Sequence, residues 1–157
     1  MDKVVQLQEE AAGIKMITLP PRSDRQIPLY VDPEILTRVL TNLISNGIKF
    51  SHPGGQIFIE YKFEGEILVG LEIHDQGVGI EPKMQERLFR IDQAESTPGT
   101  KGELGTGLGL ILCQELMKTM GGTIRYQDSN DQGSCFVLDF PLPEKPYIAG
   151  ETILDQA

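Results

Sequence analysis

Two neighbouring segments in the middle of the chain alternate apolar and polar residues, and this pattern constrains the fold more than any other feature. The apolar positions are every second residue in 57–63 and again in 67–73. A period of two is typical of strands with one buried face. Because the short segment Glu64-Gly65-Glu66 joins them, we expect an antiparallel hairpin that delivers Asp75 at its end.

Helices and strands are expected on both sides of this hairpin, which predicts an α/β fold. The clearest helix runs from Pro33 to about Lys49, since Asp32 is a good N-cap and proline suits the first helical position. Gly121 and Gly122 are expected to end a later helix. The other expected helices span residues 2–12, 82–88 and 108–120, and the other expected strands span residues 14–19, 27–31, 123–127 and 134–140.

Composition excludes several classes of protein. The 157 residues suit one domain, and 39% hydrophobic and 24% charged residues are ordinary for a globular protein. A net charge of -9 argues against nucleic acid or an anionic membrane as the partner, because both would be repelled. No apolar run approaches the roughly 20 residues that span a bilayer, and the N-terminus lacks a signal peptide's apolar core. We therefore expect a cytoplasmic protein without membrane contact.

The cysteines and histidines give no sign of a metal centre. Cys113 and Cys135 each lie in an apolar run, which favours small core residues over a disulfide or a metal site. His52 and His74 form no cluster with cysteine in the sequence, so we do not expect zinc.

Three polar residues of the long helix share one face. Asn42, Asn46 and Lys49 are spaced i, i+4 and i+7 and therefore project beside the apolar stripe. A solvated polar face is the simpler interpretation. However, asparagine is a mediocre helix former, and a surface more often carries Glu, Lys or Gln. The spacing therefore also allows a binding site.

Two glycine clusters can bring backbone amides close to a ligand. The first, Asp75-Gln76-Gly77-Val78-Gly79-Ile80, opens with a carboxylate, although an ordinary Asp-Gln-Gly turn explains it equally well. The second, Gly105-Thr106-Gly107-Leu108-Gly109-Leu110, precedes a helix, whose free amides and positive dipole end suit a phosphate. A dinucleotide-binding fold is not indicated, because a long loop, residues 92–105, precedes this cluster in place of a strand.

Taken together, these segments resemble the ATP-binding catalytic domain of bacterial sensor histidine kinases. The segment 42–50 resembles its N box and the two glycine clusters its G1 and G2 boxes, over roughly residues 30 to 143. Residues 87–92 resemble the F box and residues 96–103 resemble the ATP lid. The sequence of this lid is similar to that of hybrid or photoreceptor kinases. The resemblance implies the Bergerat fold: a two-layer α/β (α+β) sandwich with a mixed, mostly antiparallel sheet, helices on one face and a mobile ATP lid.

The resemblance also implies roles for individual residues. Asn46 is the Mg²⁺ ligand, supported by Asn42, and Asn42 and Arg90 are the catalytic residues. Asp75 accepts a hydrogen bond from the adenine amine, which guanine lacks at that position, so ATP is favoured over GTP. The implied nucleotide-binding residues are Asn42, Asn46, Lys49, Phe50, Asp75, Gly77, Gly79, Ile80, Phe89, Arg90, Lys101, Gly105, Thr106, Gly107, Leu108, Gly109 and Leu110.

The resemblance finally implies partners that this chain does not provide. The kinases phosphorylate a histidine of a dimerisation domain, for relay to a response regulator, and neither His52 nor His74 suits that role. We expect residues 1–12 to end a connecting helix, residues 13–143 to form the catalytic domain and residues 144–157 to form a tail. The fragment is expected to be monomeric and the full-length protein dimeric.

Two other functions stay open at this stage. One is a stand-alone Bergerat-fold ATPase or an anti-sigma-type serine kinase, which Asn42 disfavours because the ATP-hydrolysing relatives have Glu at that position. Slow or absent ATPase activity is therefore expected. The other is a partner-binding module without nucleotide, which the intact Asp75, Asn46 and glycines disfavour.

Overall fold

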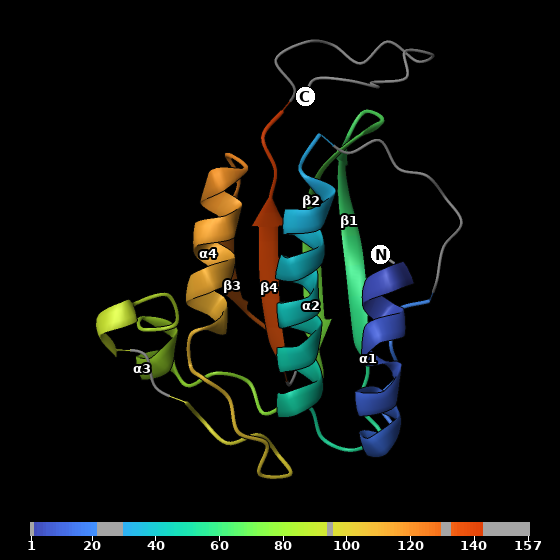
Figure 1. Cartoon of the computed structure of the whole chain (residues 1–157), viewed down its shortest axis with the longest axis vertical. Coiled ribbons are helices and arrows are strands. Elements are labelled where there is room, and N and C mark those ends of the chain that lie inside the picture. Colours follow the sequence, from blue (N-terminus) through green and yellow to red (C-terminus); the bar gives the residue numbers. More distant parts are fainter. Residues whose placement is uncertain (1, 22–29, 94–95, 130–132, 143–157) are drawn as a thin grey trace.

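The chain folds into two layers, a four-stranded sheet and three helices that cover one of its faces (Figure 1). The computed structural model describes residues 2–21, 30–93, 96–129 and 133–142. The order of the strands in the sheet is β1-β2-β4-β3, and every neighbouring pair is antiparallel. In the described part of the chain, the one parallel pairing is an isolated bridge between Thr18 and Gln56. The expected two-layer fold is confirmed.

Two hairpins build the sheet. β1 (Ile57–Glu64) pairs with β2 (Ile67–Asp75), and β3 (Thr123–Asp128) pairs with β4 (Ser134–Asp139). β2 and β4 lie side by side in the middle, so that the last residue of β2 faces the first residue of β4. All four strands were expected from the sequence. Asp75 therefore ends a central strand, next to Ser134.

The long helix α2 (Pro33–Phe50) begins where the sequence indicates. Asp32 Oδ1 accepts hydrogen bonds from the backbone N–H groups of Glu34 (2.8 Å) and Ile35 (3.1 Å). The apolar stripe of α2 is buried against the sheet and the neighbouring helices, at positions Leu36, Val39, Leu40, Leu43, Ile44 and Ile48. This burial fixes the orientation of the polar face that carries the two asparagines.

The remaining helices differ in length from expectation. α4 (Gly109–Thr119) begins one residue late and is ended by Gly121 in a left-handed conformation (φ +72°). α3 (Pro82–Gln85) is shorter than the expected 82–88, because the chain continues as turns and the 3₁₀ helix η1 (Ile91–Gln93).

Among the described helices, none combines the length and the apolar character needed to span a bilayer.

The expected strand at 14–19 is wrong. α1 (Asp2–Lys15) covers the first two of these residues, and beyond the helix Thr18 makes only a single bridge, to Gln56. The helix extends because Lys15 is buried and its Nζ donates to the carbonyls of Ile48 and Lys49 at the end of α2, both at 2.8 Å. The apolar residues Ile14 and Met16 are exposed, whereas Lys15 and Ile17 are buried, so the alternation of this segment does not mark the buried face of a strand.

The expected strand at 27–31 lies mostly outside the described residues. Its last two positions, Tyr30 and Val31, are described and belong to no strand.

Candidate functional site

The segments singled out in the sequence meet at one end of the molecule. The C-terminal ends of α2 and β2, the start of β4 and the N-terminal end of α4 all lie at the lower end of Figure 1. The loop of residues 96–108, called the lid loop here, connects η1 to α4 and passes the same end.

Asp75 is the buried charged group of this site. Its Oδ1 accepts the backbone N–H of Gly77 at 2.9 Å and that of Ser134 at 3.2 Å, and the Ser134 side chain is also hydrogen-bonded to the carboxylate. Burial raises the pKa of Asp75 to about 6, although these hydrogen bonds act in the opposite direction. A carboxylate offers about four lone-pair sites, so this group keeps acceptor capacity for a ligand.

Glycines let the backbone close tightly around this carboxylate. A Cβ on Gly77 would lie 2.5 Å from the Phe50 carbonyl oxygen and 2.8 Å from Asp75 Oδ1, so no larger residue fits there. Gly79 adopts a left-handed conformation (φ +70°) beside Gly133. Ile80 follows, partly buried against the core. The glycines of the first cluster therefore shape a tight backbone wall around Asp75.

The two asparagines of α2 are brought together by a hydrogen bond. Asn46 Nδ2 donates to Asn42 Oδ1 at 3.1 Å, which leaves the amide oxygen of Asn46 outside this bond. Gly109, at the start of α4, lies directly against Asn42, since a Cβ there would be 2.6 Å from Asn42 Oδ1. The N-terminal end of α4 is therefore packed onto Asn42, which is the partner of Asn46.

The first turn of α4 has no side-chain cap, and its N-cap residue is Leu108. Thr106 Oγ1 accepts only the N–H of Leu108, at 3.3 Å, and Gly107 is in a left-handed conformation (φ +72°). Leu110 packs partly against the core. The backbone N–H groups of this turn can therefore donate hydrogen bonds to an anion.

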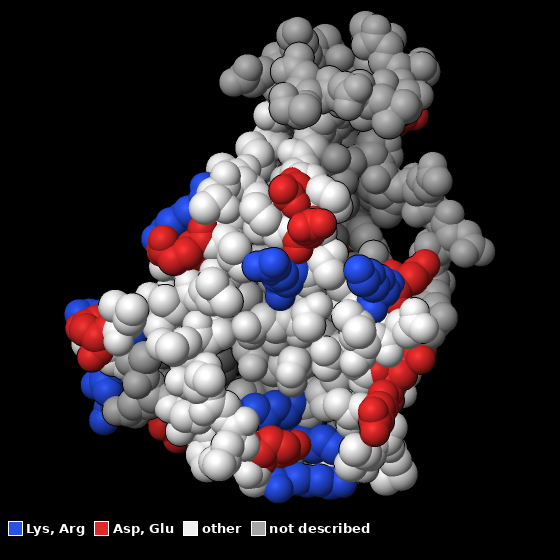
Figure 2. All heavy atoms as spheres, in the orientation of Figure 1, with Lys and Arg blue, Asp and Glu red and all other residues white. Residues whose placement is uncertain are grey.

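Three of the expected nucleotide-binding residues are cations, Lys49, Arg90 and Lys101, and each contacts a nearby protein group. Lys49 Nζ donates to the Thr97 carbonyl at 2.7 Å and lies 4.7 Å from the centre of the Phe50 ring. Burial lowers the pKa of Lys49, and the neighbouring Glu103 opposes that shift. At the lower edge of the helix-covered face, Figure 2 shows basic side chains gathered beside an acidic one.

Arg90 and Lys101 point to the protein as well. Arg90 forms a double hydrogen bond with Asp92, at 3.3 and 3.0 Å, and the guanidinium lowers the pKa of that exposed carboxyl. Lys101 Nζ donates to the Ile14 carbonyl at the end of α1, at 3.1 Å. Phe89, another of the expected nucleotide-binding residues, packs partly buried against the core. Both cations would have to exchange partners to reach a ligand.

Three residues of the site were missed in the sequence. Ser134 was expected only as the first residue of the strand 134–140, although its position opposite Asp75 in the sheet makes it a hydrogen-bond donor to the carboxylate. The buried Lys15 Nζ forms an ion pair with Oε1 of the partly exposed Glu103 at 2.7 Å, which ties the lid loop to α1 and α2. The Lys15 side chain in an amphipathic segment gave no signal of its own, because burial of a lysine depends on distant partners.

The expectation that histidine and cysteine form no cluster is wrong. The register of β2 and β4 places His74 opposite Cys135, and Cys135 Sγ lies 3.8 Å from His74 Nε2. The side chain of Glu72, two residues before His74, lies on the same face. This group is on the face of the sheet opposite the helices, away from Asp75.

Comparison with known proteins identifies the family. Residues 31–144 match the model of the histidine kinase-, DNA gyrase B-, and HSP90-like ATPase family. The chain is 34% identical over 137 residues to the circadian input-output histidine kinase CikA of Synechococcus elongatus, covering 86% of this chain and 18% of that protein. It is 32% identical over 153 residues to the signal transduction histidine-protein kinase BarA of Escherichia coli, covering 94% of this chain and 17% of that protein.

Solved structures agree with this result. The nucleotide-free catalytic domain of the histidine kinase ThkA has a TM-score of 0.72 at 25% identity, covering 89% of this chain and 88% of that one. Full-length ShkA in complex with AMPPNP has a TM-score of 0.68 at 25% identity, covering 89% of this chain and 28% of that one.

The fold and the site define an ATP-binding domain with a two-layer sandwich. The chain belongs to the histidine kinase-, DNA gyrase B-, and HSP90-like ATPase family, as an ATP-binding catalytic domain of the sensor histidine kinase type. It spans less than a fifth of the length of the two curated relatives given above.

Proposed function

We propose that this chain binds Mg-ATP and positions its γ-phosphoryl group for transfer to a histidine on a separate dimerisation domain. The phosphoryl group would then pass to an aspartate of a response regulator. The observation that carries the proposal is the buried Asp75 carboxylate, which the amides of Gly77 and Ser134 hold at the end of the sheet. The relatives are named as histidine kinases, and a related kinase is known in complex with an ATP analogue.

The residues around Asp75 fit an adenine. The exocyclic amine of adenine is a donor and can bond to the spare acceptor sites of the carboxylate. Guanine has a carbonyl oxygen at that position and would leave the buried carboxylate facing an acceptor, which costs free energy. Gly77 and Gly79 keep the backbone beside Asp75 free of side chains, and Ile80 supplies an apolar surface for the ring. Asp75 is therefore the proposed specificity residue for ATP.

The residues of α2 and α4 fit a triphosphate and a magnesium ion. Mg²⁺ prefers oxygen ligands, and the hydrogen bond to Asn42 leaves the amide oxygen of Asn46 available. The amides of Gly109 and Leu110 open α4 without a side-chain cap, where phosphate oxygens are favoured. Bound Mg²⁺ neutralises charge on the transferring phosphoryl group. Asn46 is the proposed ligand, with Asn42 positioning its amide.

Lys49, Phe50 and the lid loop complete the proposed site. Lys49, Arg90 and Lys101 supply positive charge near the phosphates once they leave their present partners, and Arg90 is the proposed catalytic cation. The remaining proposed contacts are the backbone and side chains of Gly105, Thr106, Gly107 and Leu108. The proton acceptor for the attacking histidine would come from the dimerisation domain, because Asn42 does not act as a base.

Titration calorimetry tests the first half of the proposal. ATP, ADP and GTP are compared with and without Mg²⁺, and we expect ATP and ADP to bind and GTP to bind at least about tenfold more weakly. Equal affinity for ATP and GTP would contradict the role of Asp75.

Phosphoryl transfer tests the second half. The chain is mixed with a dimerisation domain that carries a histidine, or with a serine-bearing protein, together with radiolabelled Mg-ATP. Label on the histidine domain supports the kinase, and label on the serine protein supports the alternative. Brisk ATP hydrolysis by the chain alone that depends on Asn42 would contradict both the assigned role of that residue and the kinase proposal.

The cellular setting follows from the proposal. Sensor kinases act on intracellular ATP, so we propose that this domain lies in the cytoplasm, is monomeric on its own and dimerises through the rest of the protein. The domain limits and the hybrid or photoreceptor subtype stay predictions. Size-exclusion chromatography with light scattering measures the oligomeric state, and a stable dimer of this chain would contradict it.

A further inference from the structure

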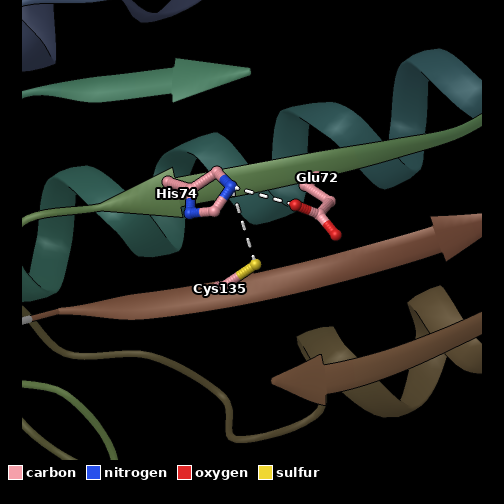
Figure 3. Close-up of side chains that lie close together, drawn as sticks. All are labelled: Glu72, His74 and Cys135. Atoms are coloured by element: carbon pink, nitrogen blue, oxygen red, sulfur yellow. Dashed lines mark hydrogen bonds and ion pairs between the residues drawn. The ribbon is translucent and has the colours of Figure 1, made fainter. Parts of the chain in front are cut away.

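Three side chains that can bind a metal converge on the open face of the sheet. Glu72 and His74 come from β2 and Cys135 from β4, and Figure 3 shows His74 Nε2 directed at both other groups. His74 Nε2 is 3.4 Å from Glu72 Oε2 and 3.8 Å from Cys135 Sγ. The side chain of Phe58 stacks on the His74 ring with centroids 4.5 Å apart and planes 4° apart, which holds the ring in this orientation.

These separations match the edges of a tetrahedral zinc site. With zinc bonds of about 2.05 Å to nitrogen and oxygen and about 2.3 Å to sulfur, tetrahedral angles place N and O about 3.3 Å apart and N and S about 3.6 Å apart. The three ligand atoms of the triad all lie within 4.8 Å of one another. Small side-chain rotations are therefore enough to enclose an ion.

We propose that Glu72, His74 and Cys135 form a site for Zn²⁺, distinct from the proposed Mg-ATP site. Imidazole and thiolate ligands favour zinc, whereas Mg²⁺ prefers oxygen alone. Cys135 is 1% exposed and Glu72 7%, so the ion would be held within the sheet surface. The fourth position is left to water or to another ligand.

In the metal-free state, the thiol proton of Cys135 and the positive charge of Lys62 both oppose zinc binding. The thiol of Cys135 must release its proton, and burial raises its pKa to about 11, with Glu72 and Glu60 acting in the same direction and Lys62 and Arg125 opposing them. Lys62 Nζ forms a close ion pair with Glu72 Oε1. Zinc binding therefore releases a proton, tightens as the pH rises and displaces the ammonium of Lys62.

The site is separate from the nucleotide pocket although it adjoins it in sequence. His74 precedes Asp75 and Cys135 follows Ser134, but successive side chains of a strand point to opposite faces. Asp75 faces α2, since a Cβ on Gly47 would lie 3.4 Å from Asp75 Cβ. Zinc binding can therefore be measured without ATP and independently of the proposed kinase function.

Calorimetric titration of the reduced, metal-free chain with Zn²⁺ tests the proposal. We expect one ion per chain, and a weakening of more than about 100-fold in His74→Asn and in Cys135→Ser, which exceeds the usual effect of outer-shell partners. Lys62→Met should strengthen binding about two- to fivefold, because it removes the competitor of a surface ion pair. Co²⁺ should give a thiolate-to-cobalt charge-transfer band in the near ultraviolet that is lost in Cys135→Ser.

Matched controls make the result decisive. His52→Gln removes the other histidine, which is exposed, and Asp75→Asn alters the nucleotide pocket, so both should keep the wild-type affinity for Zn²⁺. Circular dichroism without metal shows whether the ligand variants fold, and neither the Lys62→Met result nor the Co²⁺ band of the wild type depends on those variants. The proposal is overturned by no binding in the wild type, by weaker binding in Lys62→Met, or by an equal loss in His52→Gln and His74→Asn.

Discussion

The two ends of the proposed nucleotide site differ in how far they are formed before a ligand arrives. At the base end, the Asp75 carboxylate is buried and held by the amides of Gly77 and Ser134. At the phosphate end, Lys49, Arg90 and Lys101 already contact protein oxygens. The free-energy cost of arranging the base end therefore falls on folding. The cost of rearranging the phosphate end falls on ligand binding.

This difference assigns different tasks to the two ends. The preformed carboxylate selects the base with little rearrangement. Each cation of the phosphate end must exchange one partner for another, so its net contribution to affinity is small. We therefore expect substitutions at the base end to have the largest effects on binding and those in the lid loop the smallest.

Asp75→Asn should have the largest effect on ATP binding. The amide keeps one acceptor oxygen but loses the charge that strengthens the hydrogen bond to the adenine amine. We expect affinity to fall by about 100-fold, or roughly 3 kcal/mol, as measured by calorimetry. Asp139→Asn, at an exposed carboxylate of β4 that pairs with Arg125, is the control and should bind normally. Near-normal binding in Asp75→Asn would remove the distinction between the two ends.

The same substitution should stabilise the ligand-free chain. The folded pKa of Asp75 is about 6 against an ordinary 3.8, so the folded state binds more protons than the unfolded state between these values. Stability is therefore lost as the pH rises from about 4 to about 6, by up to about 3 kcal/mol. We expect Asp75→Asn to raise the melting temperature at pH 7 but not at pH 3.5. A lower melting temperature of Asp75→Asn at pH 7 would contradict the inference that the buried charge of Asp75 destabilises the folded chain.

Asn46→Ala should abolish the dependence of ATP affinity on Mg²⁺. The amide oxygen of Asn46 is the proposed ligand, and its loss should weaken binding about tenfold with Mg²⁺ and little in EDTA. Asn42→Ala should have a smaller effect, because it only orients Asn46. Ser45→Ala, at an exposed position of α2, is the control. Equal losses with Mg²⁺ and in EDTA would place Asn46 on the nucleotide and not on the ion.

The base end was far easier to predict from the sequence than the phosphate end. Asp32 and Pro33 fixed the start of α2, and the alternation of residues 57–73 fixed the hairpin that ends at Asp75, because these signals are local. By contrast, Lys15 and Glu103 form an ion pair although they are 88 positions apart, and this pairing depends on packing that no local pattern encodes.

The open face of the sheet shows the same limit. His74 and Cys135 are distant in sequence, and only the register of β2 and β4 brings them together. The sequence predicted both strands but gave no sign that they are neighbours. A metal cluster was therefore rejected on sequence spacing alone, which is a weak criterion in an antiparallel sheet.

Lys101→Met should weaken ATP binding only slightly. Lys101 Nζ must leave the Ile14 carbonyl before it reaches a phosphate. The binding free energy that Lys101 contributes is therefore only the difference between its contact with the phosphate and its contact with this carbonyl. We expect about a threefold loss for ATP and none for AMP, which lacks the outer phosphates. Lys118→Met, at the far end of α4, is the control. A loss above about 30-fold would show that the phosphate end is as well formed as the base end.

Glu103→Gln should change the motion of the lid loop more than it changes the affinity of the chain for ATP. Both carboxylate oxygens of Glu103 are used, Oε1 by Lys15 Nζ at 2.7 Å and Oε2 by the N–H of Lys101 at 2.8 Å. Glutamine offers one acceptor oxygen, so one of these bonds is lost and an NH₂ group faces a donor. We expect about three- to fivefold faster amide hydrogen exchange at Lys101 and Gly102, with ATP affinity within about twofold of wild type.

The pH dependence of this ion pair separates it from the Asp75 titration. The hydrogen bond from Lys15 holds the pKa of Glu103 at about 2, so the pair persists above the ordinary carboxyl pKa and is lost only as the pH falls toward 2. The stabilisation by this pair is fully present above the ordinary carboxyl pKa of 4.5, so between about pH 5 and 6 exchange in the lid loop should stay constant after correction for intrinsic rates, while Asp75 titrates. Glu66→Gln, in the exposed turn of the first hairpin, is the control. Unchanged exchange in Glu103→Gln would mean that the bonds of Lys49 to Thr97 and Thr100 hold the loop without α1.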